Sequence, residues 1–196
     1  MNRADANRMR VRLMNEDERQ IMHALFGVFS IALVLFMGRE LASYVLSVML
    51  LLGLILVHVK FSYKSIGLFE HFIRRFDREG VVPGYGALTF VAGALAITTL
   101  LETVPAILAS LFILGIGDAV SNIVGRRSRR ALSYNRKKTV DGTLAFFLSS
   151  LPAVLFAGPA AILVAAAAAL AESMESEVDD NLIISVVCVV LFRLVG

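Results

Sequence analysis

The chain alternates long apolar blocks with short polar segments. Crossing the hydrocarbon core of a membrane takes a helix of about 20 mostly apolar residues, and several blocks approach that length. The blocks therefore predict membrane-spanning helices rather than soluble amphipathic ones. They are residues 21–37, 41–59, 85–101, 104–125, 140–156, 159–171 and 182–195.

This pattern predicts an all-α fold, a polytopic transmembrane bundle of about seven spans that forms one integral membrane domain over residues 1–196. Six spans result if the fifth and sixth blocks form one kinked hairpin. Composition agrees with a membrane protein, because 58% of the residues are hydrophobic against roughly 45–50% in soluble domains. The first twenty residues are polar and basic, so we expect the first block to stay in the membrane as a span.

Charge placement predicts the orientation in the cell membrane. With a cytoplasmic N-terminus, every Lys and Arg except Arg39 and Arg193 falls on the cytoplasmic side, as the positive-inside rule requires. The polar segments of any length then share that face, which is where we expect an active site. These cytoplasmic segments are residues 1–20, 60–84, 126–139 and 172–181.

Residues 61–79 do not predict a span. Ile66, Phe69, Ile73 and Phe76 recur at helical spacing with charged residues between them. The pattern predicts an amphipathic helix in the membrane interface, either a plain connector or a wall of a lipid-facing site.

Asp118 interrupts the fourth block, where a carboxylate costs at least ~2.5–3.5 kcal/mol at mid-bilayer. Ser121, Asn122 and Gly125 follow at helical spacing and form one small, polar face with it. A buried ion pair with an arginine would explain this face, but we favour a wall of a metal or nucleotide site.

A basic loop follows this block. We assign Arg126, Arg127, Lys137 and Lys138 to phosphates, and Arg129 and Arg130 to anionic lipid. Thr139 is a predicted N-cap of the next helix, whose free N–H groups would point at the same phosphates.

The last polar segment, "ESMESEVDDN", is acidic. Glu172 opposes the dipole of the preceding helix, so it is not placed for local stability. Asp179, Asp180 and Asn181 stand at the N-terminus of the seventh block, where one of them would cap the helix. Two adjacent acids near a basic cluster also suggest Mg²⁺, which prefers oxygen ligands and bridges them to substrate phosphates.

Together these features predict phosphoryl or nucleotidyl transfer to a lipid. Candidate metal ligands are Asp118, Asp179 and Asp180, and candidate acid–base groups are Asp118, Glu172 and Asp180. There is no Walker A or protein-kinase motif, and the three histidines are too scattered to predict a metal site. We expect the lipid bilayer, a nucleotide and a membrane lipid alcohol as partners and no nucleic acid, and leave the oligomeric state open.

Three motifs, "GDAVSNIVGRR", "KKTVDGTLAFF" and "AESMESEVDDNL", resemble in order and spacing those of the membrane-embedded CTP-dependent lipid kinases. That family includes dolichol (polyprenol) kinase, phytol kinase and the CTP-using diacylglycerol kinase of yeast. The resemblance covers residues 120–196 best. It implies transfer of the γ-phosphate of CTP to a lipid hydroxyl with Mg²⁺.

The resemblance carries site roles to particular residues of each motif. Asp141 departs from the family pattern, where a glutamate is expected before the glycine. The matching residues are Asp118, Asn122, Arg126, Arg127, Lys138, Thr139, Gly142, Glu172, Asp179, Asp180 and Asn181.

Two other functions compete with this one. CDP-lipid synthases, which are phosphatidate-type cytidylyltransferases, share a similar Asp-containing span but differ at the C-terminal motif. A non-enzymatic transporter would carry polar residues along several spans, whereas the polar residues here crowd one side.

Overall fold

The computed structural model describes residues 3–62 and 84–195. Their regular structure is helical, without β-strands, and Ala131 and Thr139 form an isolated antiparallel bridge. The predicted interfacial helix over residues 61–79 lies almost entirely outside the described residues. The all-α prediction is confirmed for the part of the chain that is described.

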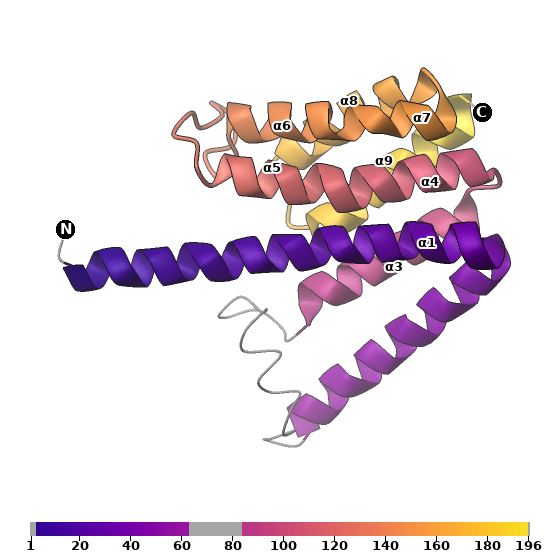
Figure 1. The fold of residues 1–196 in the computed structure, drawn as a ribbon, viewed down its shortest axis with the longest axis horizontal. Helices are drawn as coiled ribbons and strands as arrows, with labels where there is room; N and C mark the ends of the chain where they lie inside the picture. Colours follow the sequence, from indigo (N-terminus) through magenta and orange to yellow (C-terminus); the bar gives the residue numbers. More distant parts are fainter. Residues whose placement is uncertain (1–2, 63–83, 196) are drawn as a thin grey trace.

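The helices coincide with the apolar blocks over most of their length, and Figure 1 shows how they are arranged. Two differences go beyond the ends of the blocks. Helix α1 extends through the polar residues 3–20 that precede the first block, and the fifth block is divided into α6, η2 and α7. The elements are α1 (Arg3–Ser62), α3 (Tyr85–Leu100), α4 (Val104–Phe112), the π-helix η1 (Ile113–Gly117), α5 (Asp118–Gly125), α6 (Val140–Ser150), the 3₁₀ turn η2 (Leu151–Ala153), α7 (Val154–Ala157), α8 (Ala160–Ser173) and α9 (Asp180–Val195).

Helix α1 contains the first two predicted spans, folded back at Gly38 (Figure 1). Gly38 has φ 77° and ψ 167°, a conformation that residues with a Cβ rarely adopt. The gap at residues 38–40 between the first two apolar blocks therefore coincides with the bend in α1.

Three helices are long and apolar enough to cross a membrane: Glu16–Lys60, Val104–Gly125 and Val140–Ala157. Tyr85–Leu100 and Ala160–Ser173 are shorter apolar helices. The count of seven spans stays a prediction, because length and composition do not decide whether the shorter helices cross.

The helix formed by α4, η1 and α5 is the centre of the bundle. In its most apolar stretch 67% of the residues are buried, against 11% in α1 and 22% in α6–α7. Helix α5 packs on α6, α3 packs on α1 and α9, and α8 packs on α6 and α9. Large apolar side chains also point outward, such as Phe36 at 87% and Leu155 at 85% exposure. Such an apolar exterior suits a lipid solvent.

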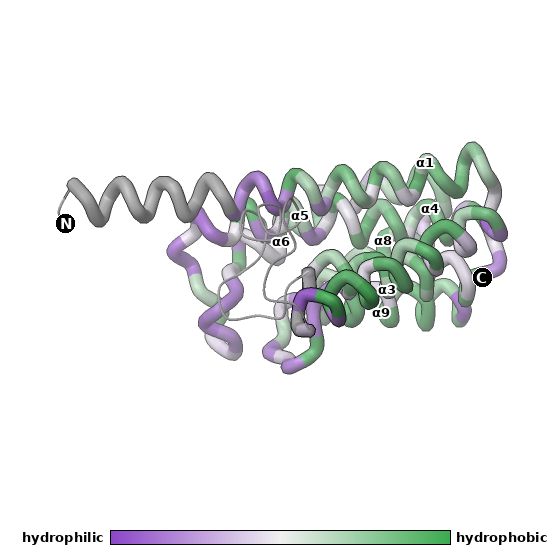
Figure 2. Tube along the Cα trace, turned by 90° about the horizontal axis from the view of Figure 1, so that it is seen from below, coloured by the Kyte–Doolittle hydropathy of each residue, from purple (hydrophilic) through white to green (hydrophobic). Residues whose placement is uncertain are grey.

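Polar residues gather at one end of the bundle, around the α5–α6 and α8–α9 connections (Figure 2).

Arg39 and Arg193, the two basic residues that the positive-inside rule does not place on the cytoplasmic side, lie at the other end of the bundle. Both donate hydrogen bonds to carbonyl oxygens of α3. Arg39 donates to the carbonyls of Thr98 and Thr99, each at 3.0 Å. Arg193 donates to Leu100 O at 2.8 Å and pairs with Glu102. Cations at a helix C-terminus are stabilising, so both arginines have a local structural role.

Candidate metal and phosphate site

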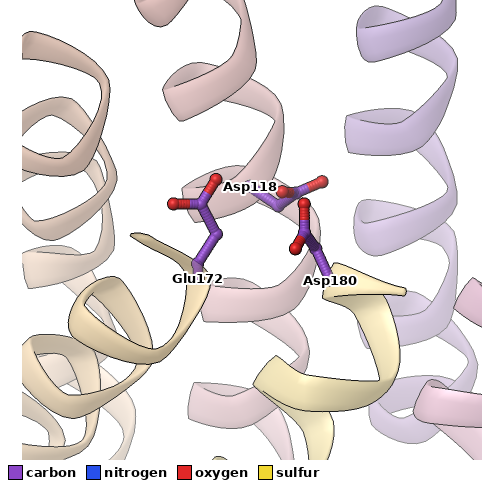
Figure 3. A group of neighbouring side chains, drawn as sticks. All are labelled: Asp118, Glu172 and Asp180. Atoms are coloured by element: carbon purple, nitrogen blue, oxygen red, sulfur yellow. The ribbon is translucent and has the colours of Figure 1, made fainter. Parts of the chain in front are cut away.

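Three carboxylates from three helices meet at the polar end of the bundle (Figure 3). Asp118 comes from α5, Glu172 from α8 and Asp180 from α9. One carboxylate oxygen of each lies within 4.8 Å of the others. We call these residues the carboxylate trio. Asp118 and Glu172 are buried, with exposures of 5% and 1%, and Asp180 is half-buried.

Asp118 stands directly after the π-helix, whose wider turn lies inside an otherwise α-helical segment. Such π-helical turns are rare in proteins, and those that occur are often found at functional sites. Asn122 lies one turn further on and donates from Nδ2 to Asp118 Oδ1 at 2.9 Å. The polar face predicted from helical spacing therefore exists, with Asn122 orienting Asp118.

Lys138 binds two members of the trio. Its ammonium donates to Glu172 Oε1 and, at 2.8 Å, to Asp180 Oδ2. Burial alone would lower the pKa of Lys138, but the carboxylates of Glu172 and Asp180 outweigh burial and hold that pKa above its ordinary value. Lys138 is therefore an ammonium at neutral pH.

The loop between α5 and α6 is docked on the end of α8, which brings Lys138 to Glu172. Asn135 is buried and donates to Ser173 O at 3.0 Å. The hydroxyls of Tyr134 and Ser173 are hydrogen-bonded at 2.8 Å. These contacts fix a segment that has no regular structure of its own.

Helix α6 begins as predicted, since Thr139 Oγ1 accepts from Gly142 N at 3.1 Å. The expectation of free N–H groups in this first turn is wrong for two residues. Gly142 N is used by the cap, and Val140 N donates to Arg130 O at 2.9 Å. Gly142 itself lies against α5, where an added Cβ would be 3.1 Å from Gly125 Cα. Its position serves helix packing.

The two predicted phosphate arginines are paired with α1. Arg126 binds Glu16 at 3.2 Å and Asp17 at 2.7 Å, and Arg127 also binds Asp17. These ion pairs tie the end of α5 to α1. Lys137 lies at the exposed rim, where it pairs with Glu175 at 3.0 Å.

The acidic segment divides into ligand candidates and structural groups. Glu172 lies inside the last turn of α8, not after its end as predicted. Asp179 accepts from Asn181 N at 3.1 Å, a capping contact, and is not a member of the trio. Asn181 is buried and donates to Thr89 Oγ1 at 3.1 Å, joining α9 to α3.

The sequence did not indicate His23 of α1. Its Nε2 lies 3.4 Å from both Leu114 O and Asp118 Oδ2. Its ring packs edge-on against Phe90, with centroids 4.6 Å apart. No local spacing connects His23 with Asp118, because 95 positions separate them in the chain; only the packing of α1 on η1 does so.

The chain is 32% identical over 172 residues to the uncharacterized protein MJ1137 of Methanocaldococcus jannaschii. The match covers 86% of this chain and 88% of the archaeal one. The chain belongs to the family of that archaeal protein. No protein-family model and no solved structure matches it.

Proposed function

We propose that this protein is a membrane-embedded lipid kinase that transfers the γ-phosphate of CTP to the hydroxyl of a lipid. The acceptor is an isoprenoid alcohol, of the polyprenol, dolichol or phytol type, or a diacylglycerol-like lipid. The reaction takes place at the cytoplasmic end of the bundle. CTP as the donor rests on the motif resemblance.

One observation carries the proposal: a carboxylate trio with two buried members, two of whose carboxylates share one lysine, at the polar end of an otherwise apolar bundle. Phosphoryl transfer needs groups that position the phosphate and stabilise its negative charge. A lipid hydroxyl needs a site that is open to the membrane. The trio with Lys138 offers groups that can position a phosphate and stabilise its charge. The apolar exterior of the bundle supports access for a lipid from the membrane.

The trio fits a divalent cation such as Mg²⁺. One oxygen of each carboxylate lies within 4.8 Å of the others, and the Lys138 ammonium contacts two of the three carboxylates. Glu172 Oε2 is buried with no hydrogen-bond partner among the described residues. Asp118, Glu172 and Asp180 would hold the ion, in place of the set with Asp179 expected from the sequence. An ion held there would supply positive charge that neutralises the substrate phosphates.

The residues of the chain then have separate tasks. Lys138 stabilises charge on the phosphates, and it directly precedes the Thr139 cap at the positive end of the α6 dipole. The lipid hydroxyl oxygen attacks the γ-phosphorus, the bond between that phosphorus and the β–γ bridging oxygen breaks, and CDP leaves. The hydroxyl proton passes to a carboxylate, for which Asp118, Glu172 and Asp180 remain the candidates.

Purified protein in detergent, incubated with γ-labelled CTP and a lipid alcohol, tests the proposal. We expect the label in the lipid fraction. Label only in released pyrophosphate would contradict a kinase and indicate a CDP-lipid synthase. A matrix of nucleotides against isoprenoid alcohols and diacylglycerol then identifies donor and acceptor.

A further inference from the structure

The ammonium of Lys138 lies where a cation shared by Glu172 and Asp180 would lie. It contacts Glu172 Oε1 and Asp180 Oδ2 together. Mg²⁺ binds carboxylate oxygens at about 2.0–2.1 Å, so an ion held by these two oxygens occupies the space between them. The ammonium and the ion cannot both use that space, because they exclude each other sterically and repel each other electrostatically.

The lysine does not satisfy the trio completely. Glu172 is 1% exposed, and its Oε2 has no hydrogen-bond partner in the described part of the chain. A buried carboxylate oxygen without a partner is costly. The side chains of Asp118, Glu172 and Asp180 converge on one region (Figure 3). The site therefore has acceptor capacity that the lysine leaves unused.

The Lys138 ammonium could also bind an anion other than the carboxylates. Lys138 directly precedes the Thr139 cap of α6, so its side chain starts beside the positive end of that helix dipole. A nucleotide phosphate that reaches the ammonium would offer it an alternative anionic partner. Moving the ammonium to such a phosphate would open Glu172 and Asp180.

We propose that Lys138 and a divalent cation compete for Glu172 and Asp180, so that the ion binds firmly only when a nucleotide phosphate draws the ammonium away. The inference rests on the metal site of the proposed kinase and adds an order of events to it. The free protein holds its own cation at the trio, and the metal enters together with the nucleotide.

Binding of Mn²⁺ alone to the full chain in detergent, followed by electron paramagnetic resonance, tests this competition. We expect weak binding to the unaltered protein and a Kd at least about tenfold lower in Lys138→Met, which keeps the side-chain length but removes the competing charge. Lys137→Met is the matched control, since Lys137 pairs with the exposed Glu175 outside the trio. It should bind Mn²⁺ like the unaltered protein.

A second substitution shows where the ion binds. Adding Glu172→Gln to Lys138→Met should abolish the gain in affinity, because one carboxylate of the trio is lost. Unchanged or weaker Mn²⁺ binding in Lys138→Met would overturn the inference. So would a gain that survives Glu172→Gln.

A measurement on the unaltered protein avoids any dependence on the folding of a variant. The Lys138 side chain is 21% exposed and that of Lys137 is 80% exposed. Saturating Mn²⁺ should raise the rate of Lys138 acylation severalfold, read by peptide mass spectrometry, with Lys137 as the internal reference. An unchanged Lys138 rate would contradict displacement.

Neither measurement contains nucleotide or lipid, so they do not depend on kinase activity. A protein that shows the Mn²⁺ competition but never labels a lipid from γ-labelled CTP would refute the kinase and retain the inference. A protein that labels lipid from CTP but shows no Mn²⁺ competition would support the kinase and refute the inference.

Discussion

At the scale of single residues, a carboxylate inside an apolar run is the clearest signal in this chain. Burying Asp118 is costly unless other groups compensate, and the structure supplies Asn122 at 2.9 Å and Lys138 nearby in the same cluster. Glu172 gives a weaker signal, because a glutamate at the end of an alanine-rich helix looks like a solvated terminus. In the fold it is among the most buried polar residues.

Asp118→Asn should abolish lipid phosphorylation, with a fall in turnover of at least about 100-fold, because the amide removes a negative ligand from the trio. The side chain keeps its size, so the protein should still fold and insert. Turnover with γ-labelled CTP and size-exclusion chromatography in detergent measure the two effects.

Glu177→Gln is the control for this substitution. Glu177 is an exposed residue of the same acidic segment and lies outside the trio. We expect turnover within about twofold of the unaltered protein, as for surface substitutions away from special contacts. Near-normal activity of Asp118→Asn would refute its assignment to the site.

At the scale of elements, two glycines set how α1 crosses the central helix. A Cβ added to Gly115 of η1 would lie 2.6 Å from Gly27 Cα, and the reverse distance is 2.7 Å. Both obstacles are backbone atoms, which cannot move aside as a side chain can. This close crossing, of the kind small residues allow between membrane helices, also brings His23 to Asp118.

Gly115→Ala should therefore destabilise the protein, by about 1–3 kcal/mol, as overpacked sites do. Gly86→Ala is the matched control, because a Cβ at that position of α3 meets nothing within 4 Å. It should be neutral or stabilise the helix by up to about 1 kcal/mol. Thermal unfolding in detergent compares the two, and equal midpoints would contradict a close crossing of α1 and η1.

At the scale of the whole molecule, the polarity runs along the bundle rather than from core to surface. Apolar side chains cover the outside, and polar residues collect at the end that carries the trio (Figure 2). The arginines at the opposite end are paired with carbonyls of α3. A bilayer is the solvent that matches this distribution.

Cysteine labelling tests the predicted orientation. Cys188 is the chain's single cysteine and is buried, so Cys188→Ala gives a background without reactive thiols. Thr103 and Arg129 are exposed and lie in connections at opposite ends of the bundle (Figure 1). In intact cells a membrane-impermeant maleimide should label Thr103→Cys, and should label Arg129→Cys only after permeabilisation.

Labelling of both positions in intact cells would contradict a membrane-spanning bundle with these ends. Labelling of Arg129→Cys alone would reverse the orientation and move the proposed site to the outer face. Either result is independent of the enzyme assay.

Within the described residues, the sequence by itself determined the helical class and most of the places where the chain turns. Long apolar blocks force the backbone to satisfy its hydrogen bonds within each helix, so α3, α4 to α5, α6 and α9 could be located closely. The cap at Thr139 and the polar face of Asp118 and Asn122 were predicted because they depend on neighbours three or four positions away.

Only the tertiary structure decided which charged groups meet. Glu172 rather than Asp179 joins the trio because α8 extends to Ser173 and packs against α6 and α9. Arg126 and Arg127 form ion pairs with Asp17 of α1. His23 contacts Asp118. All of these contacts join segments that are far apart in the chain. Hydropathy and helical spacing act within one helix, whereas the pairing of charges depends on how helices cross, and a single sequence does not reveal those crossings.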